Sequence, residues 1–144
     1  MLPDLIAFTT SVVFLTLALW HFRMAFSTST GESAAVPSVD GKPLFMPSRT
    51  STVAVGIVLI LFAALVAATA QLLATGLSQN LLAGLSYALA LGLLARAIGD
   101  FKYLGFFKRV RGSRFATMDT RVYSPLCTLL AAAVALNAVL HHAT

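Results

Sequence analysis

The sequence predicts an all-α fold: an integral membrane four-helix bundle, with a short cytoplasmic interfacial amphipathic helix between helices three and four. Three observations support this prediction. Of the 144 residues, 58% are hydrophobic and only 10% are charged, whereas a water-soluble domain of this size needs more charged residues to cover its surface. Four apolar segments are each long enough to cross a membrane as a helix. The charged residues gather between these segments.

A chain of this length is ordinarily one domain, so we expect a single transmembrane domain over residues 1–144. We expect four spans, at residues 4–26, 52–73, 81–100 and 124–141. The two longer loops are then residues 27–51 and 101–123. The single cysteine, Cys127, cannot form an internal disulfide, and no Cys/His cluster has metal-ligand spacing. We therefore expect no metal and no cofactor.

The first span begins with Pro3 and Asp4, which suit the first turn of a helix, where a missing N–H and a negative charge are both tolerated. The apolar run from Leu5 to Phe22 is long enough to cross the membrane. Trp20 then lies at interface depth, and Arg23 can extend to water.

The first loop contains three prolines and two glycines between residues 27 and 50, with a turn signal at Asp40-Gly41. Leu44, Phe45 and Met46 form an apolar island within it. One interpretation is that this island dips into the lipid headgroups. The other is a re-entrant loop over a cavity between helices, which requires protein or water to satisfy its backbone.

The second span carries two pairs of small residues four apart, Ala63 with Ala67 and Ala64 with Ala68, which permit close helix contact. The connector at residues 74–80, ATGLSQN, is short and uncharged. Because short connectors join antiparallel neighbours, we expect the second and third spans to form a hairpin.

The third span repeats Gly84, Ala88, Gly92 and Arg96 every four residues, and Asp100 continues the row. Residues at this spacing share one helix face. The three small residues predict a helix-packing face. Arg96 and Asp100 predict an ion pair across one helical turn.

Residues 101–110 predict the amphipathic helix. An apolar arc would be formed by Tyr103, Leu104, Phe106, Phe107 and Val110, and the opposite arc by Lys102, Lys108 and Arg109. A helix of this kind lies in the membrane interface with its rings in the lipid and its cations near the phosphates.

The fourth span begins with a start signal, Ser124 as N-cap and Pro125 as first helical residue. Asn137 lies within this span, and its amide should bond to another helix. His141 and His142 follow near the far interface, and a terminal His pair is a weak metal signal.

The Lys and Arg residues predict the orientation. All ten lie in the loops after the first and third spans, or at the helix ends beside them. The side with both termini has none. The positive-inside rule then places the charged loops in the cytoplasm and both termini outside.

Candidate site residues lie mostly in the second charged loop and at the helix ends beside it. As contacts for a lipid headgroup or a partner, the candidates are Arg96, Asp100, Lys102, Tyr103, Lys108, Arg109, Arg114, Asp119, Arg121 and Tyr123. Arginine and lysine suit the capture of an anionic group. If the site were catalytic, Asp100 or Asp119 would be the base, but no known motif assigns catalytic residues.

Three function classes remain open. The first is an accessory subunit, assembly factor or lipid-interacting module of a larger membrane complex. The second is an enzyme acting on an anionic lipid headgroup at the cytoplasmic interface. The third is an oligomeric small transporter, which usually needs an acid deep in the membrane. None of the acids lies deep within a predicted span; they are Asp4, Glu32, Asp40, Asp100 and Asp119.

Anionic membrane lipids and other integral membrane subunits are therefore the expected partners. Nucleic acid is not expected, because the positive charge is confined to the flanks of apolar segments, where it usually sets topology and contacts lipid.

Three segments carry a family resemblance: VDGKPLFMPSRTSTVAV in the first loop, GDFKYLGFFK after the third span, and DTRVYSPLC before the fourth. They resemble the uncharacterised small bacterial four-helix integral membrane proteins known as domain of unknown function 3995. The resemblance covers most of the chain and implies the four-helix membrane fold. It implies no established activity, so it assigns no catalytic role.

Overall fold

The computed structural model describes residues 1–27 and 35–142; the part of the predicted first loop at residues 28–34 lies outside this description. The elements in chain order are α1 (Leu2–Ala25), β1 (Ser38–Val39), β2 (Lys42–Pro43), α2 (Arg49–Thr69), α3 (Gln79–Ile98), α4 (Arg114–Met118), the π-helical turn η1 (Asp119–Tyr123) and α5 (Ser124–His142). Because α4, η1 and α5 are continuous, the described residues form four helices long and apolar enough to cross a membrane. The predicted all-α fold with four long apolar helices is confirmed.

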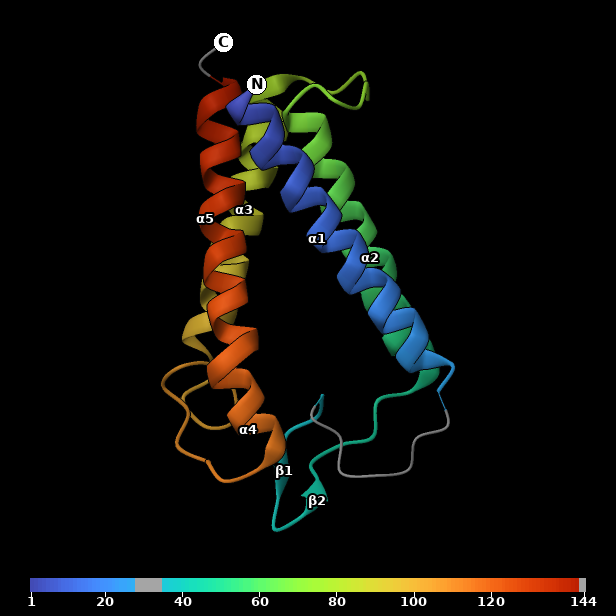
Figure 1. Cartoon of the computed structure of the whole chain (residues 1–144), viewed down its shortest axis with the longest axis vertical. Coiled ribbons are helices and arrows are strands. Elements are labelled where there is room, and N and C mark those ends of the chain that lie inside the picture. Colours follow the sequence, from blue (N-terminus) through green and yellow to red (C-terminus); the bar gives the residue numbers. More distant parts are fainter. Residues whose placement is uncertain (28–34, 143–144) are drawn as a thin grey trace.

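The long helices associate as two pairs, α1 with α2 and α3 with α5 (Figure 1). The pairs meet at the end that carries both termini and diverge toward the other end. The connector between α2 and α3 brings these helices together only near the connector, where the Gln79 amide donates to the Thr69 carbonyl at 2.8 Å. The expected α2–α3 hairpin is thus present, but each helix packs mainly against a different partner.

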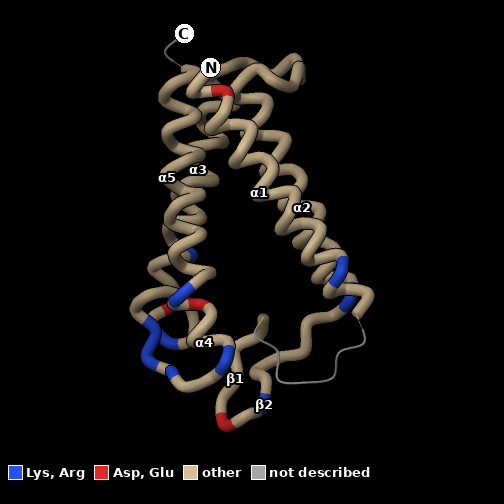
Figure 2. Tube along the Cα trace, viewed as in Figure 1, with Lys and Arg blue, Asp and Glu red and all other residues tan. Residues whose placement is uncertain are grey.

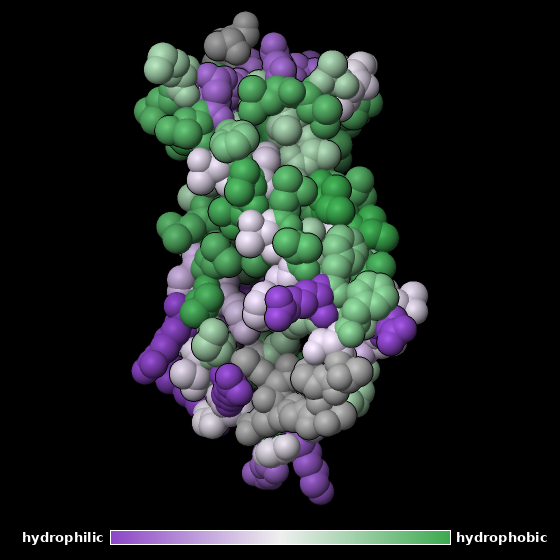
Figure 3. All heavy atoms as spheres, turned by 45° about the vertical axis from the view of Figure 1, so that its right-hand side comes forward, coloured by the Kyte–Doolittle hydropathy of each residue, from purple (hydrophilic) through white to green (hydrophobic). Residues whose placement is uncertain are grey.

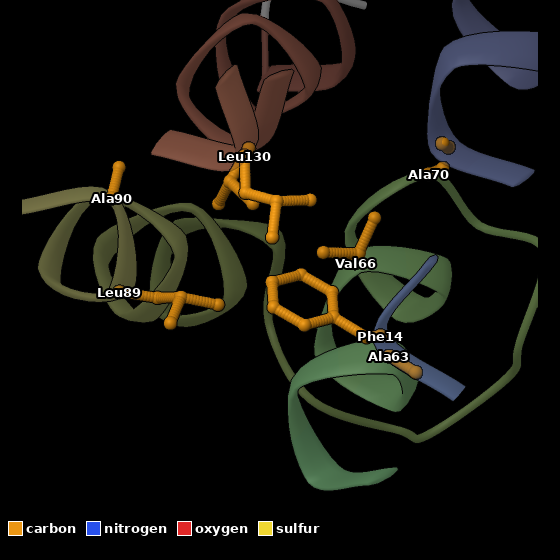
Figure 4. Close-up of a cluster of buried hydrophobic side chains, with 9 residues drawn as sticks. Phe14, Ala63, Val66, Ala70, Leu89, Ala90 and Leu130 are labelled. Atoms are coloured by element: carbon orange, nitrogen blue, oxygen red, sulfur yellow. The ribbon is translucent and has the colours of Figure 1, made fainter. Parts of the chain in front are cut away.

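The core lies where the two pairs meet. Phe14, Val66 and Val134 are completely buried there, one from each of α1, α2 and α5. The Phe14 ring points between the two pairs toward Leu89 and Leu130 (Figure 4). Lipid tails are as apolar as these side chains, so close packing rather than transfer out of water favours this association.

Polar side chains join the helices within the apolar region. The buried Asn137 amide donates to the Val66 carbonyl at 3.1 Å, which confirms the predicted bond to another helix. The Thr69 and Ser86 hydroxyls lie 2.9 Å apart and link α2 to α3. Ser11 of α1 donates to the Ala63 carbonyl of α2 at 3.2 Å. Each such bond contributes about 0.6 kcal/mol in a membrane.

The small-residue face of α3 is exposed. A Cβ added at Gly84 or Gly92 would meet nothing within 4 Å, and Ala88 is also exposed. Within the described residues this face does not pack against the other helices, because α3 buries a different face, formed by Leu82, Ala83, Ser86, Leu89, Ala90 and Ala97. Between α2 and α3 lies an apolar groove of about 760 Å³, whose small lining residues are Ala64, Ala68, Ala88 and Gly92.

The predicted amphipathic helix at residues 101–110 is wrong, because this segment consists of bends and turns. Gly99 ends α3 with a φ of 90°, and Gly105 has a φ of 83°. The chain between these glycines turns back on the end of α3, so that the Phe106 N–H donates to the Ala97 carbonyl at 2.8 Å. A Cβ on Gly99 would overlap the Leu104 carbonyl.

The last long helix begins earlier than predicted. Ser113 is the N-cap, and its hydroxyl accepts from the Ala116 N–H at 3.0 Å. Ser124 has helical angles, φ −69° and ψ −44°, so the predicted N-cap there is wrong. Pro125 lacks an N–H, and its ring opposes the carbonyl four residues earlier. The wider π turn directly before Pro125 accommodates it, and the Ser124 N–H bonds to the Asp119 carbonyl instead.

The first loop forms a two-stranded hairpin, with β1 antiparallel to β2. Its turn residues Asp40 and Gly41 have φ of 50° and 73°, which matches the predicted turn. Leu44, Phe45 and Met46 follow with exposed side chains rather than folding between helices. Over the molecule as a whole, the surface in Figure 3 has an apolar middle between more polar ends.

The close approach of the Gly105 backbone to the end of α3 gives a stability prediction. Gly105→Ala should lower the free energy of unfolding by more than about 4 kcal/mol, because the new Cβ would overlap the Ile98 carbonyl. Gly76→Ala is the matched control, since Gly76 also has a positive φ, 70°, but has nothing within 4 Å. The control should lose only about 1–2 kcal/mol. Thermal unfolding in detergent measures both. Equal losses of unfolding free energy in the two variants would contradict the close approach of Gly105 to the end of α3.

Candidate functional site

Asp119 is the centre of the charged end. Its side chain is completely buried. Oδ1 accepts from Arg96 Nη2 at 2.7 Å, and Oδ2 accepts from Lys108 Nζ at 3.0 Å and from the Gly105 N–H at 2.8 Å. One carboxylate therefore joins the end of α3, the following loop and the π turn.

Lys108 is also buried, with a side-chain exposure of 1%. Besides Asp119, its ammonium donates to the Gly105 carbonyl at 2.8 Å and to Thr120 Oγ1 at 2.6 Å. These three acceptors use all three donors of the ammonium. The predicted role of Lys108 at a lipid headgroup is wrong, because the side chain points into the protein.

Asp100 has a different partner from the one predicted. Its Oδ1 accepts from three backbone N–H groups, those of Lys102 at 2.9 Å, Tyr103 at 2.7 Å and Leu104 at 2.9 Å. Led by the bond from Leu104, these bonds hold the pKa of Asp100 below its ordinary value. The predicted Arg96–Asp100 ion pair is wrong, because α3 ends at Ile98 and the chain turns away at Gly99.

The remaining candidates lie on the surface around this cluster. Lys102 is exposed, and its ammonium lies 4.9 Å from the centre of the Tyr103 ring. Tyr123 is partly buried, and its ring centre lies 6.0 Å from that of Phe115. Among the remaining candidates, three arginines are exposed: Arg109, Arg114 and Arg121. Among the predicted site residues, the structure brings Arg96, Lys108 and Asp119 into direct contact and leaves the others outside.

Sequence reasoning missed Gly105 and Thr120 as contacts of the buried charges. A usable signal was the pair of glycines that enclose a short segment, Gly99 and Gly105, with Asp100 directly after the first. Glycines mark sharp turns, and an aspartate often accepts from backbone N–H groups a few residues later. That pattern indicates a compact loop rather than a continuing helix.

This arrangement restricts the chemistry available at the charged end. A general base needs a carboxylate oxygen that can reach a substrate proton. Both oxygens of Asp119 are held by internal donors and shielded from solvent, and Asp100 serves the loop backbone. Within the described parts of the chain, no three His, Cys, Asp or Glu side chains are grouped to hold a metal ion. In this conformation the two Asp119 oxygens are therefore occupied by contacts within the protein.

The cluster gives a second stability prediction. Asp119→Asn should lower the free energy of unfolding by about 3–5 kcal/mol, because it leaves the buried Lys108 ammonium without a countercharge. Asp40→Asn, at an exposed acid without an ion pair among the described residues, is the control and should change it by at most about 0.5 kcal/mol. Denaturation in detergent followed by circular dichroism measures both. A loss as small as that of the control would show that the cluster does not stabilise the fold.

Comparison with known proteins gives one match. The family model described as "Protein of unknown function (DUF3995)" matches residues 14–134, which include part or all of each long helix. No curated protein and no solved structure matches the chain. The match confirms the resemblance indicated by the loop segments: the chain belongs to the DUF3995 family of proteins of unknown function.

Proposed function

We propose that this protein is a non-enzymatic accessory subunit of a larger complex in the bacterial inner membrane, and that its charged end contacts anionic lipid. The observation that supports this proposal is that the carboxylates of Asp119 and Asp100 are both held by hydrogen bonds within the protein. Asp119 is buried among its own donors and Asp100 caps the loop backbone. An enzyme acting on a lipid headgroup would need one of them as a base, so the catalytic alternative loses support.

The distribution of charge supports the lipid contact. Lys and Arg lie at one end of the molecule, away from both termini (Figure 2). The exposed cations of the second charged segment are Lys102, Arg109, Arg111, Arg114 and Arg121. A cation near an anionic leaflet gains about 1 kcal/mol. This end then faces the cytoplasm, and the termini face outward.

The groove between α2 and α3 supports the partner. Its walls contain small side chains on both helices, and a Cβ at Gly92 would meet nothing within 4 Å. Small residues let a neighbouring helix approach the backbone closely. A transmembrane helix of another subunit against Ala88 and Gly92 would fill the groove.

The partner prediction uses a groove-filling variant. Gly92→Leu should reduce the yield of copurifying membrane subunit at least about tenfold, the effect of losing about 1.4 kcal/mol of binding free energy. The fold should be unaffected, because the position is open and leucine favours helix. Quantitative mass spectrometry after cross-linking in native membranes measures the yield.

Ala132→Leu, at an exposed position on α5, adds an apolar side chain outside the groove and should retain the copurifying subunit. Equal yields from Gly92→Leu and Ala132→Leu would show that the groove is not the docking site. Recovery of the unsubstituted chain without any membrane subunit would reject the accessory role.

The orientation prediction uses cysteine labelling. In a Cys127→Ala background, Thr75→Cys in the uncharged connector should react with a membrane-impermeant maleimide added to intact spheroplasts. Met46→Cys, at an exposed position of the first charged loop, should react only after permeabilisation. The opposite labelling pattern would overturn the proposed orientation.

A further inference from the structure

The two charged loops meet at a polar cavity of about 540 Å³. One wall is the first-loop hairpin, residues 38–41, and the other is the segment at residues 109–113 before α4. These segments are far apart in the sequence, and both lie at the end of the molecule opposite the termini, where Lys and Arg gather (Figures 1 and 2). The cavity is separate from the buried Asp119 cluster.

Two arginines line this cavity. Arg109 and Arg111 are both exposed, and neither forms an ion pair with Asp40 among the described residues. Arg111 Nε donates to the Lys108 carbonyl at 3.4 Å. Because Lys108 is itself held by Asp119, this bond connects Arg111 to the rigid part of the loop and leaves its terminal nitrogens for a ligand.

A buried hydroxyl provides a second and independent indication of a ligand. Ser38 is only 5% exposed and lines the same cavity. Its Oγ is buried without a hydrogen-bond partner among the described residues. Leaving such a group unsatisfied costs about 1–3 kcal/mol. Because Ser38 lines the cavity while its Oγ is closed to solvent, a rotation of the side chain would bring the hydroxyl to a ligand oxygen that accepts its proton, and this would remove the cost.

We propose that this cavity binds the phosphodiester group of a phospholipid headgroup or of a soluble phosphodiester. Planar guanidinium groups bind phosphate oxygens through paired hydrogen bonds, which gives Arg109 and Arg111 the main role. Ser38 donates to a phosphate oxygen, and the Asp40 carboxylate lies at the rim. Two arginines and one carboxylate leave a net charge of +1, which matches the single negative charge of a diester better than the two charges of a phosphate dianion.

This inference depends on the proposed lipid contact only for the source of the phosphodiester. The chemistry of recognition is the same for a lipid and for a soluble diester. The test therefore compares dihexanoyl phosphatidylglycerol, dihexanoyl phosphatidylethanolamine, glycerophosphoglycerol and inorganic phosphate, each titrated against the purified full chain in a non-ionic detergent. Binding is measured by native mass spectrometry and by the shift in Tm.

The unsubstituted chain should bind one phosphodiester, and Arg109→Gln should weaken this binding at least about tenfold, as expected for loss of a hydrogen bond to a charged group. Ser38→Ala should weaken it by a smaller factor. Arg23→Gln removes an exposed cation outside the cavity and should leave the affinity unchanged. The ligand-free Tm of Arg109→Gln should equal that of the unsubstituted chain, because this exposed side chain forms no hydrogen bond with the part of the chain that the structure describes.

Tighter binding of the two lipids than of glycerophosphoglycerol identifies a lipid as the source, and equal binding identifies a soluble diester. Undiminished binding by Arg109→Gln, or tighter binding of inorganic phosphate than of every diester, overturns the proposal. The accessory role is tested separately, by copurification: it fails if no membrane subunit copurifies with the unsubstituted chain. A chain that binds phosphodiester without a partner would reject the accessory role and retain the cavity.

Discussion

The buried Asp119 carboxylate determines the form of the charged end. It is held by cations from two segments, Arg96 at the end of α3 and Lys108 in the loop, and by the backbone of Gly105. Taking a carboxylate and an ammonium out of water costs several kcal/mol per ion, which only close and complete pairing offsets. The cluster therefore links this loop to α3 and to the π turn, and Arg111 in the same loop donates to the carbonyl of the buried Lys108.

The rest of the molecule depends on contacts of another kind. The two helix pairs meet through Phe14 and its apolar neighbours, and through single polar bonds such as that from Asn137 to Val66. In a membrane such bonds are modest, and close packing supplies most of the association. The protein thus combines a strongly constrained charged end with a bundle whose pairs contact each other over a limited region near the termini.

The sequence was sufficient for the features that depend on composition and local chemistry: the four long apolar helices, the turn at Asp40-Gly41 and the inter-helix bond of Asn137. The errors arose where a tertiary contact overrides a local pattern. Lys108 fits the basic arc of a predicted helix, yet its ammonium is buried in an ion pair with Asp119. Ser124-Pro125 has the local form of a helix start, yet Ser113 begins the helix and a π turn accommodates the proline. Pairing across the bundle cannot be read from α3 alone, so the pattern did not show that its small-residue face lies open among the described residues.

The unequal lengths of the helices have a consequence for the bilayer. The continuous helix from Arg114 to His142 has 29 residues and is about 44 Å long, close to the thickness of a bilayer with its headgroups. α2 has 21 residues and at about 32 Å covers only the hydrocarbon core. A thicker or thinner membrane imposes a hydrophobic mismatch on the helices, and this mismatch differs even within a pair, because the 29-residue helix packs against the 20-residue α3. Because the pairs are joined mainly near the termini, they can relieve that mismatch by changing tilt relative to each other, which makes their angle sensitive to membrane thickness.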